Sequence, residues 1–285
     1  MQENYNFSPK FFEVVKAAYH SESQKVDFIN PEHEEKARKE INIWVEQKTK
    51  NKIKELIKPG ILNVDRRLIL VNAIYFNGKW AKKFDSSLTK EDDFDVSPEK
   101  KIKAKFMHVE NHYNYYKDEE IQTIEIPYKD SIASMLVILP NEMQNLKTVE
   151  ASLNPAYYKT IISSLQNKSV QLSLPKFKTT AEFKLNAVLS NMGMPLSFTP
   201  NADFSGMRAD SLKDLFISDA LHKAFVNVSE VGTEAAAATA IVMTTCSAPA
   251  PPLLFKVDHP FIFIIKDNAT GSILFMGEIK DPTQE

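Results

Sequence analysis

The sequence predicts an α+β fold rich in strands, built as one domain over residues 1–285. Three observations support this prediction. Helical periodicity occurs only in a few separate segments, strand-like apolar or alternating segments recur through most of the chain, and no internal repeat or flexible linker divides it. With 285 residues, of which 43% are hydrophobic and 25% charged, the chain is long enough to bury a large core.

The first half of the chain begins with a helical pattern and continues with strands. Between residues 31 and 59, apolar residues recur near helical spacing, with acidic residues early and lysines late, which predicts an amphipathic helix. The continuous apolar run from Leu68 to Phe76 ends at Asn77-Gly78 and predicts a buried strand in the middle of a sheet. Three further strands are predicted between Ile102 and Leu139, separated by charged or turn-forming residues.

The second half alternates short helices with strands. Two short helices are predicted, and Gly193 ends the second of them. The predicted helices span residues 154–165 and 185–193; the predicted strands span residues 170–183, 215–232, 259–268 and 272–279. The last two strands are joined by the turn residues Asn268 to Gly271.

Composition excludes several classes of function. Lys and Arg total 35 against 37 Asp and Glu, and the chain has no long basic run, so the charge needed to bind nucleic acid is missing. A single cysteine, Cys246, excludes an intrachain disulfide framework and a multi-thiolate metal site. The seven glycines form no phosphate-binding loop. We therefore expect no metal and no small-molecule cofactor.

Two catalytic or metal motifs are weak. His108 and His112 have the i, i+4 spacing of zinc-binding helices, but on the strand expected here they would stand about 13 Å apart. A cysteine protease based on Cys246 with His222 or His259 would need a helix N-terminus or a cation to stabilise the thiolate. The neighbours of Cys246 supply neither.

The run from residue 235 to residue 255 carries no charge and is unlike the rest of the chain. A membrane span is disfavoured by Pro249, Pro251 and Pro252, so no membrane partner is expected. A buried alanine helix is a second interpretation. The third is an exposed loop followed by an edge strand, and the sequences around it favour this one.

Four stretches carry a resemblance to the serpin family: VNAIYFNGKW, VNVSEVGTEAAAATA, VDHPFIFII and GSILFMGEI, which lie in family order. The resemblance extends from Tyr5 to Pro282. The loop of this chain is similar to the loops of inhibitory members of the ovalbumin-like or insect groups. It implies a serpin fold, with large mixed β-sheets surrounded by helices and an exposed reactive-centre loop at about residues 230–252. Serpins have roughly a hundred further residues before the stretch at Tyr5, so the resemblance implies a single serpin domain truncated at its N-terminus.

The resemblance implies that the protein is a protease inhibitor and not an enzyme. A serine protease of the chymotrypsin or elastase type would cleave the loop, become acylated, and be carried across the sheet as the loop inserts. Glu230 to Cys246 is 17 residues, the loop length of inhibitory members, which places the scissile bond between Cys246 and Ser247. The medium-sized side chain of Cys246 suits elastase-like and chymotrypsin-like pockets. Met243 and Thr245 are alternative cleavage positions.

The loop hinge is the part that must enter the sheet first. Its residues, by the resemblance, are Glu230, Gly232, Thr233, Glu234, Ala235, Ala236, Ala237 and Ala238. In a strand, alternate side chains face opposite sides, and the face that starts at Thr233 carries no charge as far as Met243. The composition is therefore compatible with insertion into a packed sheet.

Three positions outside the loop also match the family. Asn72 and His222 match the shutter, where polar side chains bridge the strands that must part. Trp80 matches the breach, where the loop begins to enter. Ordinary core packing is the alternative for His222 and for Trp80.

Two rival functions remain open at this stage. The chain is either a non-inhibitory serpin that serves as carrier, chaperone or storage protein, or an inactive truncated isoform. The small residues of the hinge favour inhibition over the carrier, chaperone or storage role, and the inactive truncated isoform stays open. We expect extracellular action, with a cytoplasmic location as the alternative.

Overall fold

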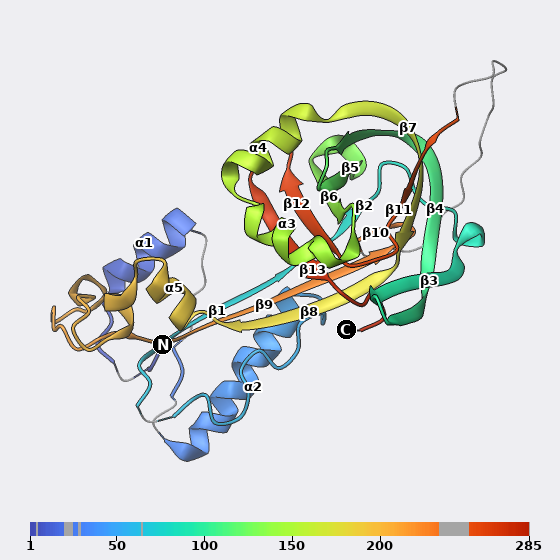
Figure 1. Cartoon of the computed structure of the whole chain (residues 1–285). Coiled ribbons are helices and arrows are strands. Elements are labelled where there is room, and N and C mark those ends of the chain that lie inside the picture. Colours follow the sequence, from blue (N-terminus) through green and yellow to red (C-terminus); the bar gives the residue numbers. More distant parts are fainter. Residues whose placement is uncertain (4, 20–24, 28–29, 64, 234–250, 285) are drawn as a thin grey trace. The chain divides into compact units, whose positions relative to one another are not determined.

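The computed structural model describes residues 1–3, 5–19, 25–27, 30–63, 65–233 and 251–284 (Figure 1). The chain divides into two compact units. The first comprises Met1–Tyr75 and Thr180–Phe225, and the second comprises Phe76–Thr179 and Val226–Glu285. Strands β8 (Phe177–Lys184) and β9 (Ile217–Ser229) run from one unit into the other along the chain.

The described residues of the first unit form three α-helices, two short 3₁₀ helices and one complete strand. The α-helices and the strand are α1 (Pro9–Tyr19), α2 (Pro31–Lys48), β1 (Leu68–Tyr75) and α5 (Asn186–Asn191). α2 begins where the side chain of Asn30 accepts a hydrogen bond from the backbone N–H of Glu32, as an N-cap does. It packs through Val45 against Leu221 and Phe225 of β9 in one apolar cluster.

The predicted helix from residue 31 is confirmed but ends at Lys48, well before residue 59. After Thr49, the residue that follows the helix, Lys50 and Asn51 have φ values of 50° and 60°, which turn the chain back. The amide of Asn42 then donates to the carbonyl of Ile57 and accepts from its N–H, both at 2.9 Å. Ile53 is buried because the chain folds back over α2.

The predicted strand at Leu68 is confirmed, but one of its faces is exposed. β1 pairs in parallel with β9, and Ile69, Val71, Ala73 and Tyr75 join the cluster under α2. On the opposite face Leu70 is 44% exposed and Asn72 is also exposed. Within the described residues β9 is the one strand paired with β1, so the prediction of a mid-sheet strand buried on both faces was wrong.

The second unit is a mixed β structure with two short helices. It contains β2 (Gly78–Lys79), β3 (Lys90–Ser97), β4 (Lys100–Lys117), β5 (Ile121–Pro127), β6 (Ala133–Pro140), α3 (Leu146–Ser152), α4 (Pro155–Ser164), β7 (Gln166–Pro175), β10 (Gly232–Thr233), β11 (Leu253–Lys256), β12 (Phe261–Asp267) and β13 (Ile273–Ile279). Its large sheet has the order β11-β7-β4-β5-β6-β12-β13, with β3 beside β4. β11 pairs with β7 in parallel, and the other neighbours are antiparallel.

Two apolar clusters hold the second unit together. One contains Trp80, Phe94 and Phe106 with inward residues of the large sheet. The other lies under α3 and α4, where Ile161 packs against Ile138 and Ile264, and Figure 1 shows both helices beside β12. The α+β fold with large mixed sheets is therefore confirmed, and the predicted strands between residues 102 and 139 are β4, β5 and β6.

Candidate functional site: the hinge and its surroundings

The described part of the hinge forms strand β10 in the second unit. Gly232 and Thr233 pair antiparallel with Ser229 and Val228 of β9 on one side. On the other side they pair antiparallel with Lys79 and Gly78 of β2. The first two residues that lead into the loop therefore already occupy a position between two strands. We call Gly78, Trp80, Tyr128, Lys176, Glu230, Gly232 and Thr233 the hinge site.

The pairing of β10 with β2 requires glycine at position 232. The φ of Gly232 is +149°, a conformation that residues with a side chain rarely adopt. A Cβ atom there would lie 2.1 Å from the carbonyl oxygen of Gly78 and 2.6 Å from the Cα of Lys79. Both contacts are with backbone atoms, so no side-chain rotation can relieve them.

Thr233 is completely buried, and its hydroxyl lies 2.8 Å from the hydroxyl of Tyr128. The Tyr128 ring stacks on Trp80 with ring centroids 4.5 Å apart and planes 11° from parallel. The indole N–H of Trp80 donates to the carbonyl of Ser229 at 2.9 Å. Burial raises the pKa of Tyr128, so its hydroxyl stays protonated and can donate at physiological pH. Trp80, the predicted breach residue, therefore lies beside the hinge.

Glu230 anchors the turn that precedes β10. Lys176 donates to both of its carboxylate oxygens, at 2.8 and 3.0 Å, and the hydroxyl of Thr89 donates to one of them at 2.9 Å. Burial raises the pKa of Glu230, but these hydrogen bonds outweigh that effect and hold the pKa below its ordinary value. The backbone also contributes, because Phe84 donates its N–H to the carbonyl of Glu230.

The two predicted shutter residues lie in the first unit. Asn72 of β1 and His222 of β9 are directly opposite each other in the parallel register. His222 stacks on Phe183 of β8 with ring centroids 6.1 Å apart, and desolvation lowers its pKa. Within the described residues no hydrogen bond joins the side chains of Asn72 and His222, so the polar bridge remains a prediction.

Part of the predicted loop cannot be placed. Glu234, the alanines from Ala235 to Ala238, and the predicted reactive bond between Cys246 and Ser247 lie outside the described residues. The chain is described again from residue 251, and β11 begins at Leu253.

Sequence reasoning missed Tyr128, Lys176 and Thr89. Tyr128 follows Pro127 at the end of β5, and 105 residues separate it from Thr233. No local pattern predicts a contact over such a separation. For Lys176 the one available signal is its charge, which complements that of Glu230.

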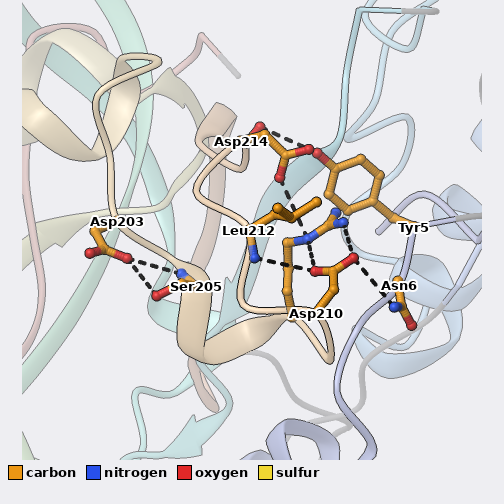
Figure 2. A network of polar contacts seen from close by, with 8 residues as sticks. Tyr5, Asn6, Asp203, Ser205, Asp210, Leu212 and Asp214 are labelled. Carbon is orange, nitrogen blue, oxygen red and sulfur yellow. Dashed lines mark hydrogen bonds and ion pairs between the residues drawn. The ribbon is translucent and has the colours of Figure 1, made fainter.

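A separate polar network ties the start of the chain to residues 203–214 (Figure 2). Arg208 lies over the ring of Tyr5 at 4.2 Å and donates to both carboxylate oxygens of Asp210. The Arg208 guanidinium lowers the pKa of Asp210 to about 2. Asn6 and the backbone N–H of Leu212 donate to the same carboxylate. This network fastens one segment to another and offers no reactive group.

The histidine pair lies on a strand, as predicted. His108 and His112 belong to β4, where the ring of His108 bonds the hydroxyl of Ser173 at 2.9 Å. The described part of the chain contains no group of three or more His, Cys, Asp or Glu side chains suited to a metal ion. Among its helices, none is both long and apolar enough to cross a bilayer.

Comparisons with known proteins agree on one family. The family model described as Serpin (serine protease inhibitor) matches residues 1–282. Serpin B4 of Homo sapiens is 39% identical over 285 residues, which cover 99% of this chain and 72% of the relative. The leukocyte elastase inhibitor of Xenopus laevis is 38% identical over 288 residues, covering 99% of this chain and 75% of the relative.

Solved structures give the same result. Serpin48 of the insect Tenebrio molitor has a TM-score of 0.85 and 35% identity over 98% of this chain and 73% of that chain. Uncleaved ovalbumin has a TM-score of 0.87 and 28% identity, covering 99% of this chain and 71% of that chain. Thyroxine-binding globulin in complex with thyroxine also has a TM-score of 0.87, with 32% identity over 100% of this chain and 74% of that chain.

Proposed function

The chain belongs to the serpin (serine protease inhibitor) family, and from this premise we propose that it inhibits a serine endopeptidase as a suicide substrate. The serine hydroxyl of the protease attacks the carbonyl carbon of Cys246, and the bond to the nitrogen of Ser247 breaks. The proton passes through the protease's own base to the released amine of Ser247. The product is an ester between the protease and Cys246, which water would normally hydrolyse. Insertion of the loop distorts the protease before that hydrolysis.

The observation that carries the proposal is the position of β10. Gly232 and Thr233 already lie between β9 and β2, buried and uncharged. A loop that continues from Thr233 as a strand would extend a pairing that has begun. Because β10 is antiparallel to β9 and β9 is parallel to β1, the inserted strand would run antiparallel to both neighbours.

Strand pairing supplies a driving force for insertion. β1 and β9 must part, which breaks a parallel ladder from Leu68 to Tyr75, and two antiparallel ladders replace it. If each of roughly ten inserted residues gains about 1 kcal/mol from new hydrogen bonds, the total is on the order of 10 kcal/mol. A gain of this size favours insertion of the cleaved loop over the state in which it stays in water.

The residue at the scissile bond suggests the class of target. Cys246 is of medium size and weakly polar, which suits the primary pocket of elastase-like and chymotrypsin-like proteases and not a pocket that carries a carboxylate. A relative of this chain is named leukocyte elastase inhibitor. Extracellular action stays a prediction, with the cytoplasm as its alternative.

A non-inhibitory role is the second candidate. Ovalbumin and thyroxine-binding globulin are non-inhibitory members of the family, and each has a TM-score of 0.87 with this chain. The fold is therefore shared by inhibitory and non-inhibitory serpins and does not by itself indicate inhibition. A carrier, chaperone or storage role would not need the hinge to enter the sheet. An inactive isoform stays the other alternative to inhibition.

The test is to mix the chain separately with elastase, chymotrypsin and trypsin and to analyse the products on denaturing gels. Inhibition predicts a covalent adduct with elastase or chymotrypsin and release of a peptide of 39 residues that starts at Ser247. The matched control is Thr233→Arg, because a charge cannot enter the fully buried site of Thr233. This variant should be cleaved without forming an adduct. Cleavage of the parent chain without an adduct would contradict the proposal and favour the second candidate.

A further inference from the structure

The hydrogen bond between Thr233 and Tyr128 is formed inside an apolar cluster. Thr233 is the last described residue before residue 251, and both Thr233 and Tyr128 are buried. A hydroxyl that loses its partner in such a place retains the full cost of desolvation. The hydrogen bond between Thr233 and Tyr128 therefore stabilises the position of Thr233 in β10.

Contacts other than the one with Thr233 also fix Tyr128. Its ring packs against those of Trp80 and Phe76, with ring centroids 4.5 and 4.8 Å away. Its backbone N–H donates to the carbonyl of Ala133 at 3.0 Å, and it forms an antiparallel bridge with Trp80. Because these contacts fix the position of the tyrosine hydroxyl, the hydrogen bond forms when Thr233 occupies its place in β10.

We propose that Tyr128 is a positioning residue that holds the hinge in the sheet as far as Thr233, so that insertion after cleavage continues from this point. The proposal rests on the proposed function, whose loop movement it specifies. The tyrosine acts through the position of Thr233. Two states of the hinge follow: one with Thr233 in the sheet and one with Thr233 in water.

Each variant of the pair shifts these two states in a different way. Tyr128→Phe leaves the Thr233 hydroxyl buried without its partner, which favours the state with Thr233 in water by about tenfold. Thr233→Ser keeps a hydroxyl and therefore keeps the parent state. In the double variant Tyr128→Phe/Thr233→Val neither polar group remains, so burial of residue 233 is favourable again. The double variant should therefore reverse the effect of Tyr128→Phe.

The experiment measures hydrogen exchange of the backbone amides in a peptide that covers residues 229–233, using the full chain without any protease. We expect exchange about tenfold faster in Tyr128→Phe, and parent rates in Thr233→Ser and in the double variant. The matched control is Tyr113→Phe, which removes a buried phenol hydroxyl from the same apolar cluster without touching the hinge. It should leave exchange at residues 229–233 unchanged.

A second measurement separates this proposal from the proposed function. With a protease that forms an adduct, Tyr128→Phe should need more inhibitor molecules for each protease inactivated, because a hinge that starts in water inserts later. If no variant or parent chain forms an adduct but the exchange pattern is found, inhibition fails and the positioning role stands. Exchange in Tyr128→Phe equal to that of the parent, or a double variant that exchanges as fast as Tyr128→Phe, would overturn the positioning role.

Discussion

Replacing Gly232 with alanine should expel the hinge from the sheet. The methyl group would lie 2.1 Å from the carbonyl oxygen of Gly78 and 2.6 Å from the Cα of Lys79, distances that real Cβ atoms do not show. Since both neighbours are backbone atoms, β10 would have to move away from β2. The pairing with β2 and the bond from Thr233 to Tyr128 would then be lost together.

The size of this effect follows from its parts. A side chain at a φ of +149° costs about 1–3 kcal/mol in backbone strain. The hydrogen bonds of the hinge are lost on expulsion in the parent and in the variant alike, so they do not add to this difference. A strain of about 1–3 kcal/mol corresponds to a roughly tenfold to hundredfold shift toward the expelled hinge. Most of the fold should remain, because the apolar clusters do not depend on residue 232.

The assay is hydrogen exchange at residues 229–233, together with a urea melt that reports the stability of the whole chain. We expect roughly tenfold to hundredfold faster exchange at the hinge in Gly232→Ala and cleavage of the loop without adduct formation. Gly271→Ala is the matched control, since Gly271 also has a positive φ of +73° but nothing lies within 4 Å of an added Cβ. If Gly232→Ala kept the parent's protection at the hinge, the steric argument would be wrong.

Two further predictions concern the anchors of the hinge and of α2. Because the pKa of Glu230 is lowered in the folded chain, its contribution to stability is present above its ordinary pKa of 4.5 and is lost as the pH falls through the folded value. Glu230→Gln should therefore flatten the decrease of the urea midpoint between about pH 5 and pH 3. Lys176→Met should lower the free energy of unfolding at pH 7 by about 1–2 kcal/mol. An unchanged acid dependence in Glu230→Gln would contradict this assignment. Asn42→Ala removes two hydrogen bonds to the buried backbone of Ile57 and should cost about 2–3 kcal/mol in a urea melt, whereas a cost below about 0.5 kcal/mol would show that the segment after α2 is held by its apolar residues alone.

The helix α2 shows how far periodicity can predict an element. Its start at Pro31 and its apolar face were predicted from spacing and charge. Its end was not, because Ile53 is apolar at a position that fits a longer helix. The helix ends because of contacts that apolar spacing does not predict. The hydroxyl of Thr49 donates to the carbonyl of Val45, and the amide of Asn42 donates to the carbonyl of Ile57 in the segment that folds back over α2.

Strand β3 was missed for a related reason. Its sequence, KEDDFDVS, is highly charged and lacks the apolar alternation of a typical strand. In the structure its acidic residues face lysines of β4, such as Asp93 with Lys103 at 2.7 Å and Asp95 with Lys101 at 3.2 Å. Phe94 supplies the buried contact. Ion pairs between β3 and β4 therefore stabilise a strand that lacks the apolar alternation by which strands are predicted from sequence.

The roles of Gly78 and Gly232 in the hinge site also depend on contacts between residues far apart in sequence. Asn77-Gly78 was interpreted as a turn that ends a strand, yet the chain pairs again at once as β2. Glycine is needed there because a Cβ on residue 78 would lie 2.7 Å from the Phe76 ring and 2.8 Å from the Tyr128 ring. Across the pairing of β10 with β2, Gly78 lies opposite Thr233, and its carbonyl oxygen lies 2.1 Å from the position that a Cβ on residue 232 would take. Two glycines far apart in sequence therefore create the narrow space in which the hinge can pair, and a substitution at either one should act on the same step of insertion.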